Sequence, residues 1–369
     1  MFRSTTPEFG RALADLAQDQ PEVLGLTHAP SSAQVRLVGT GESYAAWRLD
    51  VPRNSLPETV LRAGSDALVV RAPARPVASL PQSAEVEFRA LEMAPEGFGP
   101  VPVRLVQAAD SPLGMALLVQ SFVPGRVLPN FAWTDELLAA HAGRLAGLHA
   151  RRFDGHGPLG GPLEPELDPV GILDGAVEYW EATRPDLLRD SAAGRLTTAV
   201  RTFAQEARPA FDSVPFSLLH GDAVAANILV EGGVPQYVDW EWSSIGDPAR
   251  DLGLLGAPDG ASPWYLTLDD RREDVLLRAY VEAGGADDVE RLRVRRRVHE
   301  VIEQLFTAVH FLSRLQPVGR AVVVDGRVVE PGSDVPVAPV SEKQRPVYER
   351  AVAAMFRSVY ERVGTGLQD

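Results

Sequence analysis

The sequence contains no cysteine among its 369 residues. This absence excludes disulfide bonds, zinc sites built on thiolates and cysteine nucleophiles. No uninterrupted apolar run approaches the roughly 20 residues that a membrane-spanning helix needs. Residues 1–8 also lack the basic region and apolar core of a secretory signal. We therefore expect a cytoplasmic protein without a membrane segment.

Positive charge is scarce, because 36 Lys and Arg residues face 50 Asp and Glu residues and give a net charge of −14. Binding to nucleic acid needs clustered cations, so we do not expect a nucleic-acid partner. The arginines between positions 291 and 297 lie on a predicted helix and are flanked by Glu290 and Glu300. We interpret them as a solvated helix face with local ion pairs. An acidic surface would suit a cationic small molecule.

The length predicts two domains, and the pattern of elements changes near residue 122. The first part alternates as strands 35–38, 44–49, 67–71, 100–106 and 115–122, with helices over 7–19 and 82–94 and a loop over 52–66. The second part is mainly helical, over 134–149, 170–183, 186–207, 270–283, 287–315 and 343–363, with a hairpin over 321–330. We predict an α+β protein with domains 1–121 and 122–369.

The most informative stretch runs from residue 218 to residue 241, where polar side chains follow short apolar runs. Asp222 follows a strand within His-Gly-Asp, Asn227 comes five positions later, and Asp239 ends a third apolar run twelve positions after Asn227. In kinases this spacing joins an aspartate at the acceptor hydroxyl to an asparagine and an aspartate that hold metal. The stretch therefore predicts phosphoryl transfer.

Three weaker features lie upstream. Gly39, Gly41 and Ser43 belong to a hairpin that could bring backbone N–H groups near a phosphate, although an ordinary tight turn explains the loop better when it is taken alone. Arg71 ends a strand and would serve a phosphate or remain a surface cation. Glu87, on the next helix, is the carboxylate we expect to pair with Arg71, although most such glutamates are only solvated.

Other polar residues are expected to support the fold. Asp247 precedes Pro248 and is placed to cap a helix, and Asp251 lies in its first turn, where it can hydrogen-bond a neighbouring loop. His141 and His149 are interpreted as packing or solvated groups. We expect His220 to order its loop by hydrogen bonding.

These segments resemble, in order, those of the aminoglycoside phosphotransferase and choline kinase-like group, small-molecule kinases with a protein-kinase-like fold. The resemblance covers roughly residues 35–255. It implies two lobes, a small N-terminal lobe with an antiparallel sheet and a larger helical lobe, with ATP bound between them. Asp222 would act on the acceptor hydroxyl, and Asn227 and Asp239 would bind Mg²⁺. Gly39, Gly41, Ser43, Arg71 and Glu87 would serve the nucleotide.

The sequence departs from this group at two places. Residues 223–226 are small and apolar where the group often has a His-Pro pair, and Arg71 replaces a lysine. These departures keep open a second hypothesis, a catalytically inactive nucleotide-binding protein that acts as a sensor or scaffold. The first hypothesis is an ATP-dependent kinase whose acceptor is a hydroxyl of an aminoglycoside-like, amino-alcohol or sugar-like compound. Aromatic and acidic candidates for binding a cationic acceptor are Glu178, Trp180, Trp240, Glu241 and Trp242.

Overall fold

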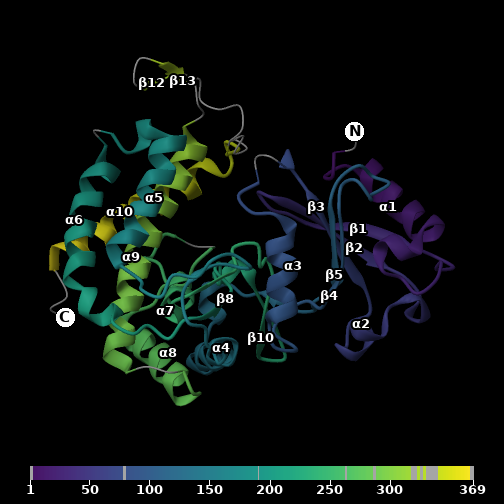
Figure 1. Ribbon diagram of the computed structural model, residues 1–369, viewed down its shortest axis with the longest axis horizontal. Coiled ribbons are helices and arrows are strands. Elements are labelled where there is room, and N and C mark those ends of the chain that lie inside the picture. The colour runs from purple at the N-terminus through teal and green to yellow at the C-terminus, as the bar shows by residue number, and fades with distance from the viewer. Residues whose placement is uncertain are drawn as a thin grey trace. The chain divides into compact units, whose positions relative to one another are not determined.

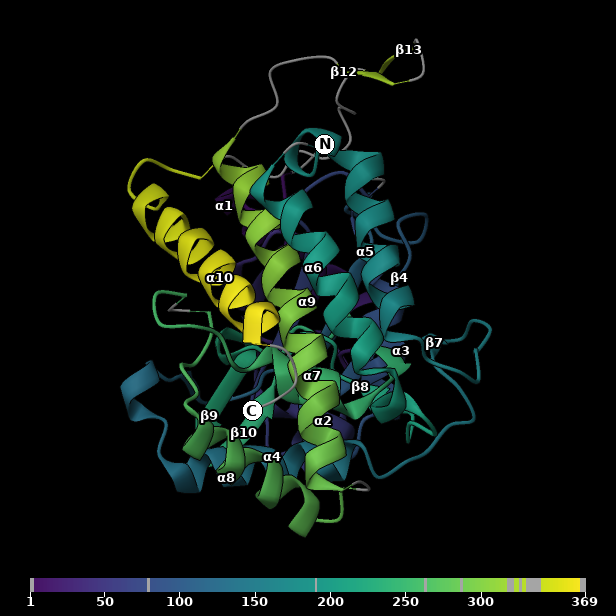
Figure 2. The same ribbon diagram turned by 90° about the vertical axis from the view of Figure 1, so that its left-hand side faces the viewer.

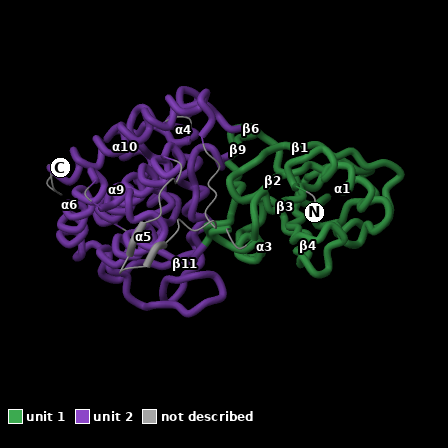
Figure 3. Tube along the Cα trace, turned by 90° about the horizontal axis from the view of Figure 1, so that it is seen from above, with its two compact units in different colours: residues 1–126, 229–243 green, residues 127–228, 244–369 purple. Residues whose placement is uncertain are grey.

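The computed structural model describes residues 3–77, 80–189, 191–261, 264–285, 288–316, 322–324, 327–329 and 340–365. The chain divides into two compact units (Figure 3). Unit 1 comprises residues 1–126 and 229–243, and unit 2 comprises residues 127–228 and 244–369. The segment 229–243 therefore returns to the unit formed by the first third of the chain. The predicted domain boundary after residue 121 stays a prediction.

Unit 1 is built on a five-stranded antiparallel sheet in the order β1-β2-β3-β5-β4 (Figure 1). Its strands are β1 (Gln34–Thr40), β2 (Tyr44–Asp50), β3 (Leu68–Pro73), β4 (Pro102–Val106) and β5 (Leu117–Ser121). Its helices are α1 (Pro7–Asp19), η1 (Pro21–Leu24), η2 (Arg53–Ser55), α2 (Glu58–Arg62) and α3 (Ala84–Met93). The later segment adds the strands β9 (Ile228–Glu231) and β10 (Val234–Tyr237). Helix α2 lies within the range predicted as a loop, so that prediction is wrong there.

The hydrophobic core of unit 1 fills the space between α1 and one face of the sheet. Phe9 and Leu13 of α1 belong to the same buried cluster as Trp47 and Val70 of the strands. Side chains alternate between the faces of a strand, so Arg71, next to Val70, points to the other face. That face is where α3 packs against β4 and β5.

Unit 2 is mainly helical and is organised around the long helix α9 (Figure 2). Its helices are α4 (Asp135–Leu148), α5 (Pro169–Thr183), α6 (Ala192–Glu206), α7 (Pro248–Leu254), α8 (Asp270–Glu282), α9 (Val289–Leu315) and α10 (Arg345–Thr365), with the short η4 (Asn130–Ala132), η5 (Pro185–Leu187), η6 (Arg208–Phe211) and η7 (Ala225–Asn227). A small sheet has the order β7-β11-β8, formed by β7 (Gly157–Pro158), β8 (Ser217–Leu219) and β11 (Ser244–Gly246). The strand β6 (Arg126–Val127) spans the point where the chain leaves unit 1.

The predicted hairpin near the C-terminus is present as β12 (Val322–Val324) and β13 (Arg327–Val329), which pair antiparallel. The Asp-Gly pair of the predicted turn lies outside the described residues. None of the helices in the described ranges combines the length and the apolar character that crossing a membrane requires.

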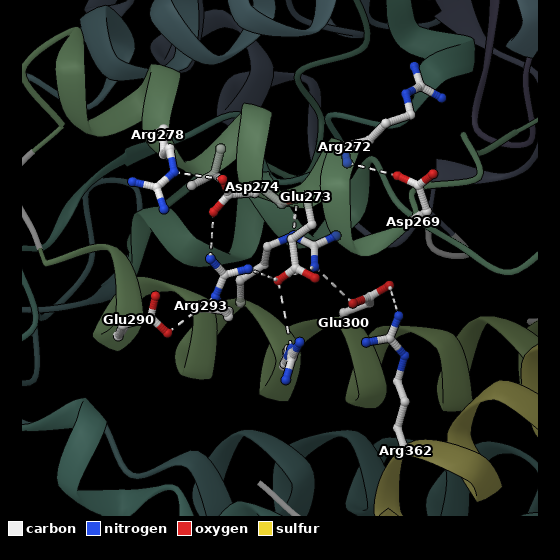
Figure 4. Close-up of polar contacts among 12 residues, drawn as sticks. Asp269, Arg272, Glu273, Asp274, Arg278, Glu290, Arg293, Glu300 and Arg362 are labelled. Carbon is white, nitrogen blue, oxygen red and sulfur yellow. Dashed lines mark hydrogen bonds and ion pairs between the residues drawn. The ribbon is translucent and has the colours of Figure 1, made fainter. Parts of the chain in front are cut away.

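Buried ion pairs connect three helices of unit 2 (Figure 4). Glu300 of α9 accepts from Arg296 one turn earlier, at 3.1 Å, and from Arg362 of α10, at 3.2 Å. Glu273 of α8 lies 3.4 Å from Arg296 and 3.7 Å from Arg293. Breaking one partner of such a buried pair leaves an uncompensated charge, so the network fixes how these helices pack.

The prediction of a solvated arginine face on α9 is wrong at its centre. Arg295 and Arg296 are only 0% and 1% exposed, because α7, α8 and α10 all pack on α9. Arg295 donates from Nε to Asp247 at 2.9 Å, which balances its charge inside the protein. The predicted ion pairs are present, but several are buried rather than solvated.

Candidate active site

The loop over residues 220–227 follows β8 in unit 2, ends with η7 and carries the predicted catalytic aspartate. Nδ2 of Asn227 donates to Oδ2 of Asp222 at 2.7 Å and to the backbone oxygen of Asp222 at 3.0 Å. Gly221 has φ of 82°, a left-handed conformation that glycine adopts without steric cost. The structure therefore brings together the first two polar groups of the motif and fixes the orientation of the Asp222 carboxylate.

Buried groups beneath the loop hold its backbone. The N–H groups of His220 and Gly221 donate to Oδ2 and Oδ1 of Asp251 at 2.7 and 2.9 Å. Nδ1 of His220 accepts from the N–H of Asp222 at 3.2 Å, so the histidine orders the loop as predicted. Burial alone would raise the pKa of Asp251, but hydrogen bonds, led by the one with His149, keep it below its ordinary value.

The small residues that follow Asp222 have a structural role. Ala223, Val224 and Ala225 are almost completely buried, so the loop packs against the protein through these side chains. Side chains as small as alanine allow such close packing. The contact between Asp222 and Asn227 is present although this loop has small apolar residues in place of the His-Pro pair.

In unit 1, Arg71 is the centre of a second polar group. Its Nη1 donates to Oε1 of Glu87 at 2.9 Å, which confirms the predicted pair, and its Nη2 donates to Oδ1 of Asp239 at 2.6 Å. The guanidinium fork allows both contacts at once. Asp239 has φ of 69°, which is uncommon for a residue other than glycine and often marks a functional position.

A third carboxylate, Glu241, makes this group acidic. Burial and the charge of Asp239 raise the pKa of Glu241 to about 7, although a hydrogen bond from Ser43 lowers it. Burial also raises the pKa of Glu87 to about 8, against the effect of Arg71. One guanidinium, that of Arg71, thus faces the carboxylates of Glu87, Asp239 and Glu241. Reasoning from the sequence missed Glu241 as part of this group, although its place two residues after Asp239 could have indicated it.

The glycine hairpin lies between β1 and β2. The N–H of Gly41 donates to the backbone oxygen of Tyr44 at 2.9 Å and closes the turn. A Cβ on Gly39 would meet no atom within 4 Å, so packing does not require glycine there. Ser43 is buried, and its hydroxyl bonds Glu241. The nucleotide roles of Gly39, Gly41 and Ser43 stay predictions.

The charge of Asp222 contributes to the raised pKa values of two further side chains of unit 2, Arg250 and Tyr265. Neither of them was identified as a site residue from the sequence. Arg250 donates from Nε to Oε1 of Glu303 at 2.9 Å, and Asp222 contributes to raising its pKa. The pKa of Tyr265 is also raised, mainly by burial and in part by Asp222. They lie on α7 and on the segment before α8, far from the motif in the sequence.

The aromatic candidates for binding a cation are largely occupied by packing. Trp240 is fully buried and donates to the backbone oxygen of Tyr237 at 3.0 Å. Trp180 is buried against His310, whereas Glu178 is on the exposed side of the same helix. Trp242 is 41% exposed. The prediction that Glu178 and Trp180 act together is therefore not supported by their placement.

The described residues contain no preformed cluster of three or more His, Asp or Glu side chains that could hold a metal. Mg²⁺ needs no such cluster, because proteins commonly bind it through one or two side chains together with substrate phosphates. Asn227 directs its Nδ2 to Asp222, so its Oδ1 is the atom suited to a metal. The excess of carboxylates around Arg71 also suits a divalent cation. The residues present therefore fit Mg²⁺.

Known proteins resemble this chain in sequence and in fold. The model of the phosphotransferase enzyme family matches residues 49–295. Viomycin phosphotransferase from Streptomyces vinaceus is 29% identical over 241 residues, which cover 61% of this chain and 75% of that protein.

Two solved structures share the fold at low identity. Choline kinase from Cryptosporidium parvum Iowa II has a TM-score of 0.57 at 12% identity, with 91% of both chains covered. A thermostable aminoglycoside phosphotransferase mutant in complex with AMP-PNP and hygromycin B has a TM-score of 0.55 at 15% identity, covering 96% of this chain and 99% of that one. The predicted α+β kinase-like fold and the predicted enzyme class are confirmed. From the matched residues 49–295, this chain belongs to the phosphotransferase enzyme family.

Proposed function

We propose that this protein is a kinase that uses ATP and Mg²⁺ to phosphorylate a hydroxyl group of a small molecule. The observation that carries the proposal is the contact of Asn227 with Asp222, which orients one carboxylate at the end of β8. Phosphoryl transfer depends mainly on positioning of the reacting groups and on charge neutralisation. The contact between Asn227 and Asp222 provides positioning of the carboxylate.

Asp222 accepts the proton of the acceptor hydroxyl. The acceptor oxygen forms a bond to the γ-phosphorus, the bond from that phosphorus to the β–γ bridging oxygen breaks, and ADP leaves with the electron pair. Asp222 is suited to this role because three contacts fix its place: the Asn227 amide, the ring of His220, and Asp251 through the loop backbone. A general base that is held in position typically contributes about 10²–10⁴-fold to the rate.

Asn227 and Asp239 would hold Mg²⁺, which when bound neutralises charge on the transferring phosphate. Arg71 would serve the phosphates while Glu87 holds its guanidinium in place. The hairpin with Gly39, Gly41 and Ser43 would approach the phosphates through its backbone. A cationic acceptor would suit a protein with a net charge of −14, and viomycin is an acceptor to test because viomycin phosphotransferase is similar in sequence.

A panel of acceptors tests the proposal. ADP release and ³²P transfer from ATP are measured with viomycin, hygromycin B, choline, ethanolamine and simple sugars, at saturating Mg²⁺. Asp222→Asn should lower kcat by about 10²–10⁴-fold. Asp212→Asn makes the same chemical change at an exposed position in the same unit and should leave kcat unchanged. If the wild type phosphorylates none of these compounds faster than Asp222→Asn does, the proposal is wrong for these acceptor classes.

A further inference from the structure

A line of buried hydrogen bonds runs from α8 to the backbone of the 220–227 loop. The hydroxyl of Tyr280 on α8 lies 3.1 Å from Nδ1 of His149, and Nε2 of His149 lies 3.2 Å from Oδ2 of Asp251. Asp251 in turn accepts from the backbone N–H groups of His220 and Gly221. Tyr280 is 1% exposed, and His149 and Asp251 are 0% exposed. The side chains of this line are therefore shielded from bulk solvent.

The direction of these bonds follows from the chemistry of the groups. Burial raises the pKa of Tyr280, so its hydroxyl keeps its proton. Within the described part of the chain this hydroxyl has one hydrogen-bond partner, Nδ1 of His149. A buried hydroxyl that keeps its proton donates it, so Nδ1 accepts and the ring proton sits on Nε2. The histidine then donates to Asp251, which receives three hydrogen bonds from the described residues.

The ring of Tyr280 is held tightly in its place. It packs against His149 with ring centroids 5.7 Å apart. The chain also passes so close to the ring at Gly285 that a Cβ there would clash with it. The N–H of Gly285 also donates to the backbone oxygen of Tyr280 at 2.9 Å. The hydroxyl is therefore presented to His149 by a side chain with little freedom to move.

We propose that Tyr280 is a positioning residue for phosphoryl transfer, because it holds His149 in the Nε2–H tautomer that completes the hydrogen bonds of Asp251. Asp251 then fixes the loop backbone immediately before Asp222. The inference rests on the proposed role of Asp222. It assigns a part in the reaction to a residue of α8, far from the motif in the sequence and without contact with the reacting groups.

Tyr280→Phe removes one oxygen atom and keeps the ring. Without the hydroxyl, His149 is free to take the Nδ1–H tautomer, which leaves an unprotonated Nε2 facing a carboxylate. The loss of one neutral hydrogen bond corresponds to about a 5-fold fall in kcat, with the KM for ATP unchanged. Tyr348→Phe is the matched control, since it removes another buried hydroxyl from unit 2, one that interacts with Arg314. It should leave kcat unchanged.

Two readouts separate positioning from a general loss of stability. The first is the tautomer of His149, observed in long-range ¹H–¹⁵N spectra and assigned with His149→Gln. The wild type should show the proton on Nε2, and Tyr280→Phe should show a mixture. The second is a double-mutant cycle. A glutamine amide donates to Asp251 without help, so Tyr280→Phe should have no effect on kcat in the His149→Gln background.

The proposal is overturned if Tyr280→Phe leaves the tautomer unchanged, or if its effect on kcat is the same in both backgrounds. The tautomer is measured without substrate. Suppose that Tyr280→Phe changes the tautomer of His149 as expected, but that the wild type phosphorylates no acceptor. This result would contradict the proposed function and would still support the link between Tyr280 and His149.

Discussion

Acid should destabilise this protein through His141, a fully buried residue of α4 whose edge faces Trp133. Burial lowers the pKa of His141 to about 3, although the negative charge of Asp251 acts in the opposite direction. In the unfolded chain a histidine has a pKa of about 6.5. As the pH falls below 6.5, the unfolded state therefore binds a proton that the folded state does not bind until about pH 3.

The magnitude follows from proton linkage. Each pH unit between the two pKa values removes about 1.4 kcal/mol from the free energy of unfolding. At pH 5 the loss from His141 should reach about 2 kcal/mol relative to pH 7.5. That is a large part of the stability of a typical domain, which is about 5–15 kcal/mol. The contribution of His141 is fully present above pH 6.5 and disappears as the pH falls toward 3.

Urea unfolding at several pH values between 7.5 and 5 measures this loss for the wild type and for His141→Gln. Glutamine keeps a polar group at the site but does not titrate, so the variant should lose about 2 kcal/mol less on acidification than the wild type. His28→Gln alters an exposed histidine of unit 1 and should keep the dependence of the wild type. If His141→Gln loses as much stability as the wild type, His141 is not the group responsible and the reasoning is refuted.

Two other buried contacts give predictions. Arg71→Lys keeps the charge but cannot reach Glu87 and Asp239 with one planar fork, so the KM for ATP should rise and stability should fall by about 2 kcal/mol. ATP kinetics and thermal unfolding check this, and an unchanged KM would show that lysine serves equally well. Asp247→Asn keeps a helix cap but leaves the buried arginine of α9 uncompensated, so urea unfolding should show a loss of about 3–5 kcal/mol. Asp288→Asn changes an exposed cap and should cost less than about 1 kcal/mol, and an equal loss in both variants would mean that capping alone matters.

The sequence predicted the elements of this fold well because its patterns are local. The apolar run over 67–71 predicted a strand that ends at Arg71, and the helix that follows supplied its partner Glu87. Asp247 was recognised as a cap because Pro248 follows it at the first helical position. Each of these inferences needs only a few neighbouring residues.

Tertiary burial is what the sequence did not reveal. Arg295 and Arg296 have the composition of a solvated helix face, and only the packing of three helices on α9 shows that they are inside. Tyr280 lies 131 positions from the histidine that it contacts, so no local pattern connects them. Trp240 was a candidate for binding a cation because its neighbours in the sequence are acidic, yet its ring is fully buried.

The spacing between Asn227 and Asp239 is set by the length of a hairpin. The twelve positions from Asn227 to Asp239 are occupied mainly by β9, β10 and the turn between them, where Gly232 and Gly233 have φ of 57° and 83°. Both glycines are exposed. Exposed turns tolerate insertions, so this spacing reports the length of a hairpin and not a distance required by the chemistry. What distinguishes the motif is the position of its residues next to strands. Asn227 directly precedes β9 and belongs to unit 2, whereas Asp239 follows β10 and contacts Arg71 in unit 1.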